Sequence, residues 1–369
     1  MKDGSNFARK NVMNLPPYVA GKPIEAVERE YGVTNIIKMA SNENPLHISP
    51  LAVEAMKKEL EKCYMYPEGS SPQLREKLAL KYGVDAKQII CGDGGDHVIG
   101  LICHAFINDG DEVIIGDPSF PTYSINVPLM GGILVKVPMV NYAFDLDAVL
   151  AAITPKTKMI FFCNPNNPTG TIVRRDKVAD FMSKIPDSVI VVFDEAYFEF
   201  VDDPAYPNGL EYVKAEKNVI VLRTFSKIYG LAGLRIGYAV APLHLMTALG
   251  RVIPAFPVNR LAQVAAVAAL DDTEFLTAVK KNNDEGRAYL NQQFEAMGME
   301  YAPSYGNFIF VNIGMPSQEV NQKLLYKGII IRPGFLFGFP NYLRISIGTM
   351  TENKRFIAAL KEIKAEYDK

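Results

Sequence analysis

Short runs of consecutive apolar residues, rich in Val, Ile and Phe, recur through the first two thirds of the chain and alternate with stretches of helical spacing. Such runs are typical of strands buried on both faces, whereas strands with one face in water alternate apolar and polar residues. The runs occupy residues 88–91, 112–115, 133–137, 158–162, 188–193, 218–222 and 235–240. Strands that alternate with helices in this way predict an α/β fold with a mostly parallel, seven-stranded sheet.

Two of the intervening helices carry start signals. Ser49 precedes Pro50 and Ser71 precedes Pro72, and each pair combines a capping serine with a proline suited to the first helical turn. Gly83 is expected to end the second of these helices, because glycine readily adopts the left-handed conformation that closes a helix.

The pattern changes after about residue 245 and predicts a smaller α+β domain. Its expected helices are 260–270, 273–297 and 352–367, and its expected strands are 307–311, 328–332 and 342–347. A chain of 369 residues exceeds the ~250–300 residues that one hydrophobic core serves. We therefore expect a large domain over residues 46–250 and a small domain formed by residues 1–45 and 251–369, with a cleft between them.

Composition excludes several classes of partner. Lys and Arg number 39 and Asp and Glu 41, so the formal net charge is −2 and no basic excess is available for nucleic acid or a membrane surface. No apolar run approaches the ~18–20 residues that span a bilayer, and the first ten residues lack the apolar segment of a signal peptide. The cysteines form no Cys-x-x-Cys pair and the histidines lack metal-ligand spacing. We expect a cytoplasmic protein without a metal site that acts on a small molecule.

Polar and glycine-rich segments follow five of the predicted strands at their carboxyl ends, which is where ligands bind to open α/β sheets. These segments are Gly92–Asp96, Asp117–Pro121, Asn164–Gly170, Asp194–Tyr197 and Arg223–Lys227. The first is either a tight turn before a helix or a phosphate site built on backbone N–H groups. It is not a dinucleotide fingerprint, because His97 stands where that motif needs glycine.

The residue types at these ends suggest a particular chemistry. A desolvated lysine near other cations, as Lys227 would be, has a lowered pKa and can form a Schiff base with a carbonyl. Asp194 follows five apolar residues and would be a costly buried charge unless a cation, such as a protonated pyridine nitrogen, paired with it. Arg235, expected to begin the next strand, could bind a phosphate together with Thr224 and Ser226.

These residues, in their order and spacing, resemble the fold-type-I pyridoxal-phosphate aminotransferases. The resemblance rests on Asn164-Pro-Asn-Asn167-Pro-Thr-Gly, Asp194-x-x-Tyr197 and Ser226-Lys227-x₇-Arg235, and it extends over nearly the whole chain. Further segments are similar to the histidinol-phosphate aminotransferase subfamily. They are Leu15-Pro-Pro-Tyr18, Ser41-Asn-Glu-Asn-Pro45, Tyr66-Pro-Glu-Gly and Tyr342-Leu-Arg344-Ile-Ser-Ile-Gly-Thr349.

The resemblance implies a role for each matching position. Lys227 would hold pyridoxal 5′-phosphate covalently and act as the general acid–base, and Asp194 would pair with the pyridine nitrogen. The remaining cofactor contacts would be Asn167 and Tyr197 on the phenolic oxygen, Phe120 on the ring, and Gly94, Gly95, Thr224, Ser226 and Arg235 on the phosphate. Tyr66 would reach the phosphate of the neighbouring subunit, which implies a homodimer.

Substrate binding is expected on the small-domain side. Arg344 lies between Leu343 and Ile345, so the alternation of a strand places it on the opposite face from them. The resemblance assigns this arginine to the substrate carboxylate or phosphate, with help from Arg332, and Tyr18 could cover the cleft.

The implied reaction belongs to histidine biosynthesis and converts histidinol phosphate and 2-oxoglutarate to imidazole acetol phosphate and glutamate. An aromatic amino acid aminotransferase and a lyase similar to phosphothreonine decarboxylase are the alternatives, since each would share the cofactor site. A regulator fused to a DNA-binding domain is disfavoured, because the pattern begins within about 15–20 residues of Met1. His97 and His47 stand where the subfamily usually has an acidic residue and a glycine.

Overall fold

A seven-stranded sheet forms the centre of the larger half of the protein in the computed structural model, which describes residues 7–13, 15 and 21–368. The strand order is β2-β8-β7-β6-β5-β3-β4, and only β8 runs antiparallel to its neighbours. The strands are β2 (Ile89–Gly92), β3 (Glu112–Asp117), β4 (Ile133–Pro138), β5 (Thr157–Cys163), β6 (Ile190–Asp194), β7 (Val219–Thr224) and β8 (Gly237–Val240). The predicted mostly parallel sheet of seven strands is therefore confirmed.

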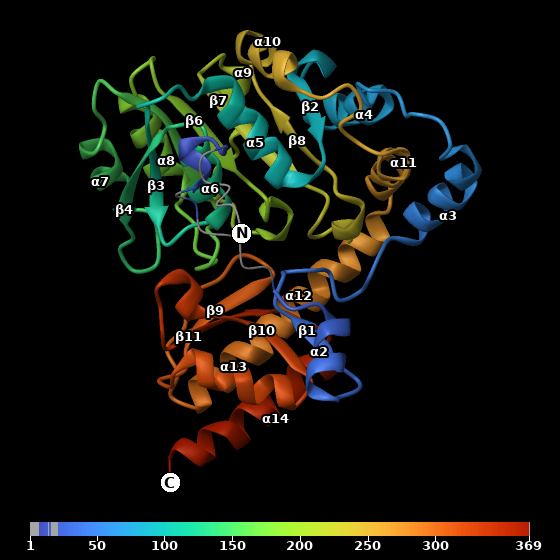
Figure 1. The fold of residues 1–369 in the computed structure, drawn as a ribbon, viewed down its shortest axis with the longest axis vertical. Coiled ribbons are helices and arrows are strands. Elements are labelled where there is room, and N and C mark those ends of the chain that lie inside the picture. Colours follow the sequence, from blue (N-terminus) through green and yellow to red (C-terminus); the bar gives the residue numbers. More distant parts are fainter. Residues whose placement is uncertain (1–6, 14, 16–20, 369) are drawn as a thin grey trace.

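The apolar runs explain why this sheet is central. Every residue of β6 and β7 is buried, as expected for strands covered on both faces. Helices surround the sheet (Figure 1). They are α3 (Pro50–Glu59), α4 (Pro72–Tyr82), α5 (Gly94–Phe106), α6 (Pro121–Leu129), α7 (Leu146–Ala151), α8 (Arg175–Lys184), α9 (Leu210–Lys214), α10 (Leu243–Val252) and α11 (Arg260–Ala269). Short 3₁₀ helices are η2 (Leu60–Lys62), η3 (Ala86–Gln88), η4 (Phe198–Phe200) and η5 (Ala232–Leu234).

A second sheet of four strands, ordered β1-β10-β11-β9, has its own hydrophobic core. Its strands are β1 (Ile37–Met39), β9 (Phe308–Asn312), β10 (Ile329–Pro333) and β11 (Tyr342–Ser346). The accompanying helices are α2 (Ile24–Tyr31), α12 (Thr273–Ala296), α13 (Ser317–Tyr326), α14 (Met350–Tyr367) and η6 (Gly334–Phe337), and a short α1 (Lys10–Met13) lies near the N-terminus. Figure 1 shows β1 and α2, drawn in blue, beside the orange and red C-terminal elements.

The helix α12 connects the two halves. Its early residue Val279 packs in the core of the large sheet, whereas Leu290 and Phe294 pack in the core of the small sheet. Ala262, Ala265, Ala266 and Ala269 of α11 also belong to the large-sheet core. Among the described helices, none combines the length and the apolar character that crossing a bilayer requires.

Local expectations were met at some helix ends and wrong at others. The Ser49 side chain accepts a hydrogen bond of 3.2 Å from the Ala52 N–H, and Gly83 closes α4 in a left-handed conformation. Ser71 does not cap α4 with its side chain, because its own backbone is left-handed and its hydroxyl is buried without a hydrogen-bond partner among the described residues. Arg235 does not begin a strand, since it lies in a turn with φ of 55° and β8 starts at Gly237.

Candidate active site

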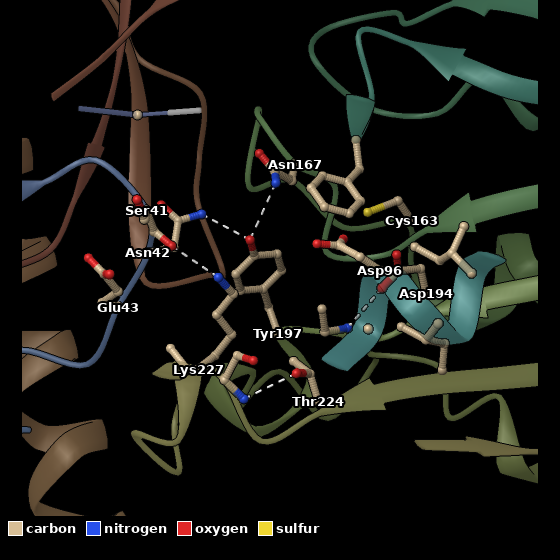
Figure 2. Close-up of a pocket in the computed structure, with 18 of the residues that line it drawn as sticks. Ser41, Asn42, Glu43, Asp96, Cys163, Asn167, Asp194, Tyr197, Thr224 and Lys227 are labelled. Atoms are coloured by element: carbon tan, nitrogen blue, oxygen red, sulfur yellow. Dashed lines mark hydrogen bonds between the residues drawn. The ribbon is translucent and has the colours of Figure 1, made fainter. Parts of the chain in front are cut away.

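A cavity of about 360 Å³ lies at the carboxyl ends of the central strands of the large sheet and is bounded on the other side by the small sheet. Residues from five strand ends and from β10 and β11 line it together (Figure 2). The expected site residues in this lining are Gly95, Phe120, Asn167, Asp194, Tyr197, Thr224, Ser226, Lys227, Arg235, Arg332 and Arg344. The cavity thus brings together residues that are up to 249 positions apart in the chain.

Lys227 follows β7 in a short loop, and its side chain reaches across the cavity toward the small sheet. The Nζ group donates a hydrogen bond of 3.0 Å to the backbone oxygen of Ser41. Burial, reinforced by the positive charge of Arg344, lowers the pKa of Lys227 to about 8. The unprotonated fraction of this amine near neutral pH is therefore much larger than that of an ordinary lysine, and the unprotonated form is the nucleophile.

Asp194 ends β6 and lies on the opposite side of Tyr197 from Lys227 (Figure 2). Its side chain is buried, and the residue is only 2% exposed. One carboxylate oxygen accepts a hydrogen bond from the Tyr123 hydroxyl, and the other accepts one of 3.2 Å from the Ala196 N–H. Burial raises the pKa of Asp194 to about 6. Within the described part of the chain this carboxylate has no ion-pair partner, so a cation that entered the cavity would gain a strong interaction with it.

Asn167, Tyr197 and Arg344 form one hydrogen-bonded chain. Arg344 Nη1 donates to Asn167 Oδ1 over 2.7 Å, and Asn167 Nδ2 donates to the Tyr197 hydroxyl oxygen over 3.4 Å. A second amide, that of Asn42, donates to the same tyrosine oxygen over 2.9 Å. The small sheet is thereby tied to the loops that follow β5 and β6.

The part of the cavity beside the first turn of α5 is suited to an anion. Its lining includes Gly95 of that turn, where unpaired N–H groups favour a negative charge, together with Thr224, Ser226 and Arg235. Gly94 allows the Arg235 guanidinium group to lie close to this turn, because a Cβ added at Gly94 would lie 2.3 Å from Arg235 Nη2.

His97 takes no part in this lining. Its Nδ1 accepts a hydrogen bond of 2.9 Å from the Asp93 N–H, which braces the turn before α5, and burial lowers its pKa.

Two expected residues lie elsewhere. Tyr66 is 78% exposed and stacks on Phe256 with ring centroids 4.5 Å apart, outside the cavity of its own chain. Tyr18 lies outside the described residues.

Several residues near the cavity were given no role from the sequence. Asn42, Glu43, Asp96 and Cys163 line it, and the Tyr123 hydroxyl donates its hydrogen bond to Asp194. The Asn42 position belongs to a motif that the sequence did display, but no periodicity or charge argument connects an N-terminal asparagine with Tyr197.

A buried ion pair was also not predicted from the sequence. Both Nε and Nη2 of Arg223 donate to Glu195 Oε2, over 2.9 and 2.8 Å, and both side chains are about 1% exposed. Glu195 follows Asp194 and Arg223 precedes Thr224, so the pair joins the ends of the two strands that carry site residues.

A lysine of lowered pKa, a buried carboxylate and an anion pocket on a sheet of this topology indicate the class of enzyme that the sequence resembles, the aminotransferases. Comparison with known proteins supports this class. The family profile described as aminotransferase class I and II matches residues 34–360. The chain belongs to this family, and its expected fold and membership are confirmed.

Individual proteins give a more specific comparison than the family profile does. The chain is similar to the histidinol-phosphate aminotransferase of Moorella thermoacetica, with 49% identity over 97% of this chain and 93% of that protein. It is 47% identical to histidinol-phosphate aminotransferase 2 of Carboxydothermus hydrogenoformans, over 97% and 99% of the two chains. Among solved structures, histidinol-phosphate aminotransferase from Sinorhizobium meliloti in complex with pyridoxal-5′-phosphate matches with a TM-score of 0.90 and 29% identity, over 97% of each chain.

Proposed function

We propose that this protein is a pyridoxal-phosphate-dependent aminotransferase that transfers the amino group between histidinol phosphate and 2-oxoglutarate, forming imidazole acetol phosphate and glutamate. The observation that carries the proposal is the placement of Lys227 and Asp194 on opposite sides of Tyr197 in one cavity, with an anion pocket at its end. The family match and relatives named for this reaction at 41–49% identity support the choice of substrate.

The residues present fit the cofactor. Asp194 is a buried carboxylate with no cation paired to it among the described residues, and a protonated pyridine nitrogen supplies one. The helix N-terminus, Thr224, Ser226 and Arg235 suit a phosphate, and Phe120 lines the same cavity. When bound, pyridoxal phosphate supplies an electron sink for the charge that develops at the substrate Cα.

The chain's own residues would perform the remaining work. Lys227 would hold the cofactor, and its amine, with a pKa lowered by burial, would serve as the base that moves the proton at the substrate Cα. Asp194 keeps the pyridine nitrogen protonated. Tyr197 and Asn167 hold the phenolic oxygen, and Gly94, Gly95, Thr224, Ser226 and Arg235 hold the phosphate.

Arg344 and Arg332 would bind the substrate anions. They are direct register partners on the antiparallel strands β11 and β10, and both line the cavity. Two adjacent guanidinium groups suit both a carboxylate and a phosphate, which the two substrates present in turn. Tyr18 is retained as a candidate cover for this end.

We further propose a homodimer in which Tyr66 contacts the cofactor phosphate of the partner subunit. Exposed apolar side chains support this idea: Phe256 stacks on Tyr66, and Leu60, Tyr64 and Met65 lie close to it in the chain. Mixing Tyr66→Phe with Lys227→Ala protein tests it, because a mixed dimer would rebuild one complete site from two impaired parents. At equal mixing a quarter of the sites should regain activity, and no recovery would exclude the shared site.

We also propose that the chain divides around its two cores, with α11 on the large-sheet side, which moves the expected boundary at residue 250 into α12.

A cytoplasmic location is proposed as well. The four cysteines, Cys63, Cys91, Cys103 and Cys163, are all free thiols, as in a reducing compartment.

The function is tested with a panel of amino donors, namely histidinol phosphate, phenylalanine, tyrosine and phosphothreonine, each with 2-oxoglutarate. We expect the highest kcat/KM with histidinol phosphate. A preference for phenylalanine or tyrosine would favour an aromatic aminotransferase, and release of CO₂ from phosphothreonine a lyase. Glutamate alone should yield one equivalent of 2-oxoglutarate per site, and Lys227→Ala should abolish this yield, whereas the exposed Lys136→Ala should not.

A further inference from the structure

Asn42 joins the two sheets at the centre of the site. It follows β1, is 1% exposed and has a left-handed backbone with φ of 55°, a conformation that asparagine tolerates better than most residues. Its backbone N–H donates to Ser346 Oγ over 2.8 Å, and its backbone oxygen accepts from Asn307 Nδ2 over 2.9 Å. The residue is therefore held by the small sheet while its side chain points at Tyr197 (Figure 2).

The hydrogen bonds of Ser346 fix which way the Asn42 amide points. Ser346 Oγ already accepts the Asn42 backbone N–H, and its hydroxyl proton is donated to Asn42 Oδ1 over 2.9 Å. With the amide turned around, Ser346 would face two donors and its own proton would lose this acceptor. The Nδ2 group of Asn42 therefore faces Tyr197 as a donor.

The orientation of Asn167 follows from Arg344. A guanidinium group can only donate, so the Asn167 atom 2.7 Å from Arg344 Nη1 is the oxygen. The Asn167 nitrogen then faces Tyr197. The tyrosine oxygen consequently accepts two N–H groups, and its own proton has to point away from both.

We infer that Asn42 is a positioning residue that directs the Tyr197 hydroxyl proton into the cavity, toward the phenolic oxygen of the cofactor. This inference rests on the proposed function, which places that oxygen beside Tyr197. A proton donated to the phenolic oxygen stabilises its negatively charged form. Asn42 thus sets the protonation of the lysine-bound cofactor without touching it.

Asn42→Asp is the sharpest test, because it keeps the shape and replaces the donor by an acceptor. The Tyr197 hydroxyl is then expected to donate to the new carboxylate. The pH midpoint of the cofactor's visible absorbance change should rise by about one to two units, the equivalent of one hydrogen bond to a charged group. Asn42→Gly, which tolerates the left-handed backbone, removes the donor without adding charge and should raise the midpoint by less.

The same substitutions in a Tyr197→Phe background separate positioning from charge and from structure. If Asn42 acts through the hydroxyl, Asn42→Gly should leave the midpoint unchanged in this background, and Asn42→Asp should shift it much less than it does when Tyr197 is present. Equal shifts in both backgrounds, or no shift in either, would overturn the inference. A wild-type protein that showed no visible cofactor band would overturn the proposed function first, and the inference with it.

Discussion

The guanidinium group of Arg344 donates a hydrogen bond of 2.7 Å to the side-chain oxygen of Asn167, and so connects the small sheet to a loop of the large sheet. Three consecutive residues extend this connection. The backbone oxygen of Ala40 accepts from Arg344, that of Ser41 accepts from Lys227, and the side-chain amide of Asn42 donates to Tyr197. The segment that leaves β1 therefore holds three cavity side chains in place before any substrate arrives.

Arg344→Gln is expected to weaken binding of both carboxylate substrates. Loss of a charge-assisted hydrogen-bond partner costs about 1.5–3 kcal/mol, so KM for glutamate and 2-oxoglutarate should rise roughly 10- to 100-fold. Because Asn167 loses its donor as well, the visible spectrum of the bound cofactor should also change. Steady-state kinetics and absorbance measure the two effects. Arg287→Gln, which replaces an arginine on α12 paired with Asp284, is the control; a variant at 344 that matched this control would contradict the assignment.

The attachment of pyridoxal phosphate to the protein should depend on pH through Lys227. Burial and Arg344 lower the pKa of this lysine to about 8, and only the unprotonated amine reacts. The attachment rate should rise about tenfold per pH unit below pH 8 and level off above it. In Arg344→Gln the levelling should move to higher pH, since one cause of the lowered pKa is removed. Stopped-flow absorbance measures this rate, and a plateau near pH 10.5 in the wild type would show an ordinary lysine.

Asp194→Asn should have opposite effects on the cofactor-free and the loaded protein. Burial raises the folded pKa of Asp194 to about 6, above its unfolded value of about 3.9. The folded state binds the proton more tightly, so its stability falls as pH rises between about 4 and 6, by about 3 kcal/mol in total. The cofactor-free variant should therefore be more stable than wild type at pH 7.5 and lose this advantage below pH 4.

Addition of pyridoxal phosphate should reverse that order. The wild-type carboxylate gains a cationic partner, whereas the amide does not, so the cofactor should raise the Tm of the variant much less. Thermal unfolding of both proteins, with and without pyridoxal phosphate, gives the comparison. An equal rise in Tm for both would mean that Asp194 does not contact the pyridine nitrogen.

Much of this site could be predicted because strand ends and alternation are local signals. Leu343 and Ile345 pack in the small-sheet core while Arg344 lines the cavity, as alternation along the strand predicts. Asn42 could not be derived in this way, because its role depends on a contact with Tyr197, 155 positions away. The prediction that Arg235 begins a strand was wrong because the sequence does not reveal that its backbone is left-handed.

The buried pair of Glu195 and Arg223 was missed for a similar reason, since each residue alone resembles an ordinary charge beside a strand. Removing one partner leaves the other charge buried and unpaired, which costs about 3–5 kcal/mol. Arg223→Met should therefore destabilise the protein strongly, and burial would then raise the pKa of Glu195 further than it already does. Chemical unfolding of the cofactor-free protein measures this loss.

A second variant separates the pair from the packing around it. Arg223→Met combined with Glu195→Leu removes both charges, so it should recover much of the stability that the single change loses. The exposed pair of Lys184 and Asp180, with 2.7 Å between Nζ and Oδ2, is the matched control, and Asp180→Asn should leave the stability nearly unchanged. If Arg223→Met cost no more than this control, the pair would not be what joins β6 to β7. The positions of Asp194 and Thr224 at those two strand ends would then have to depend on the sheet hydrogen bonds alone.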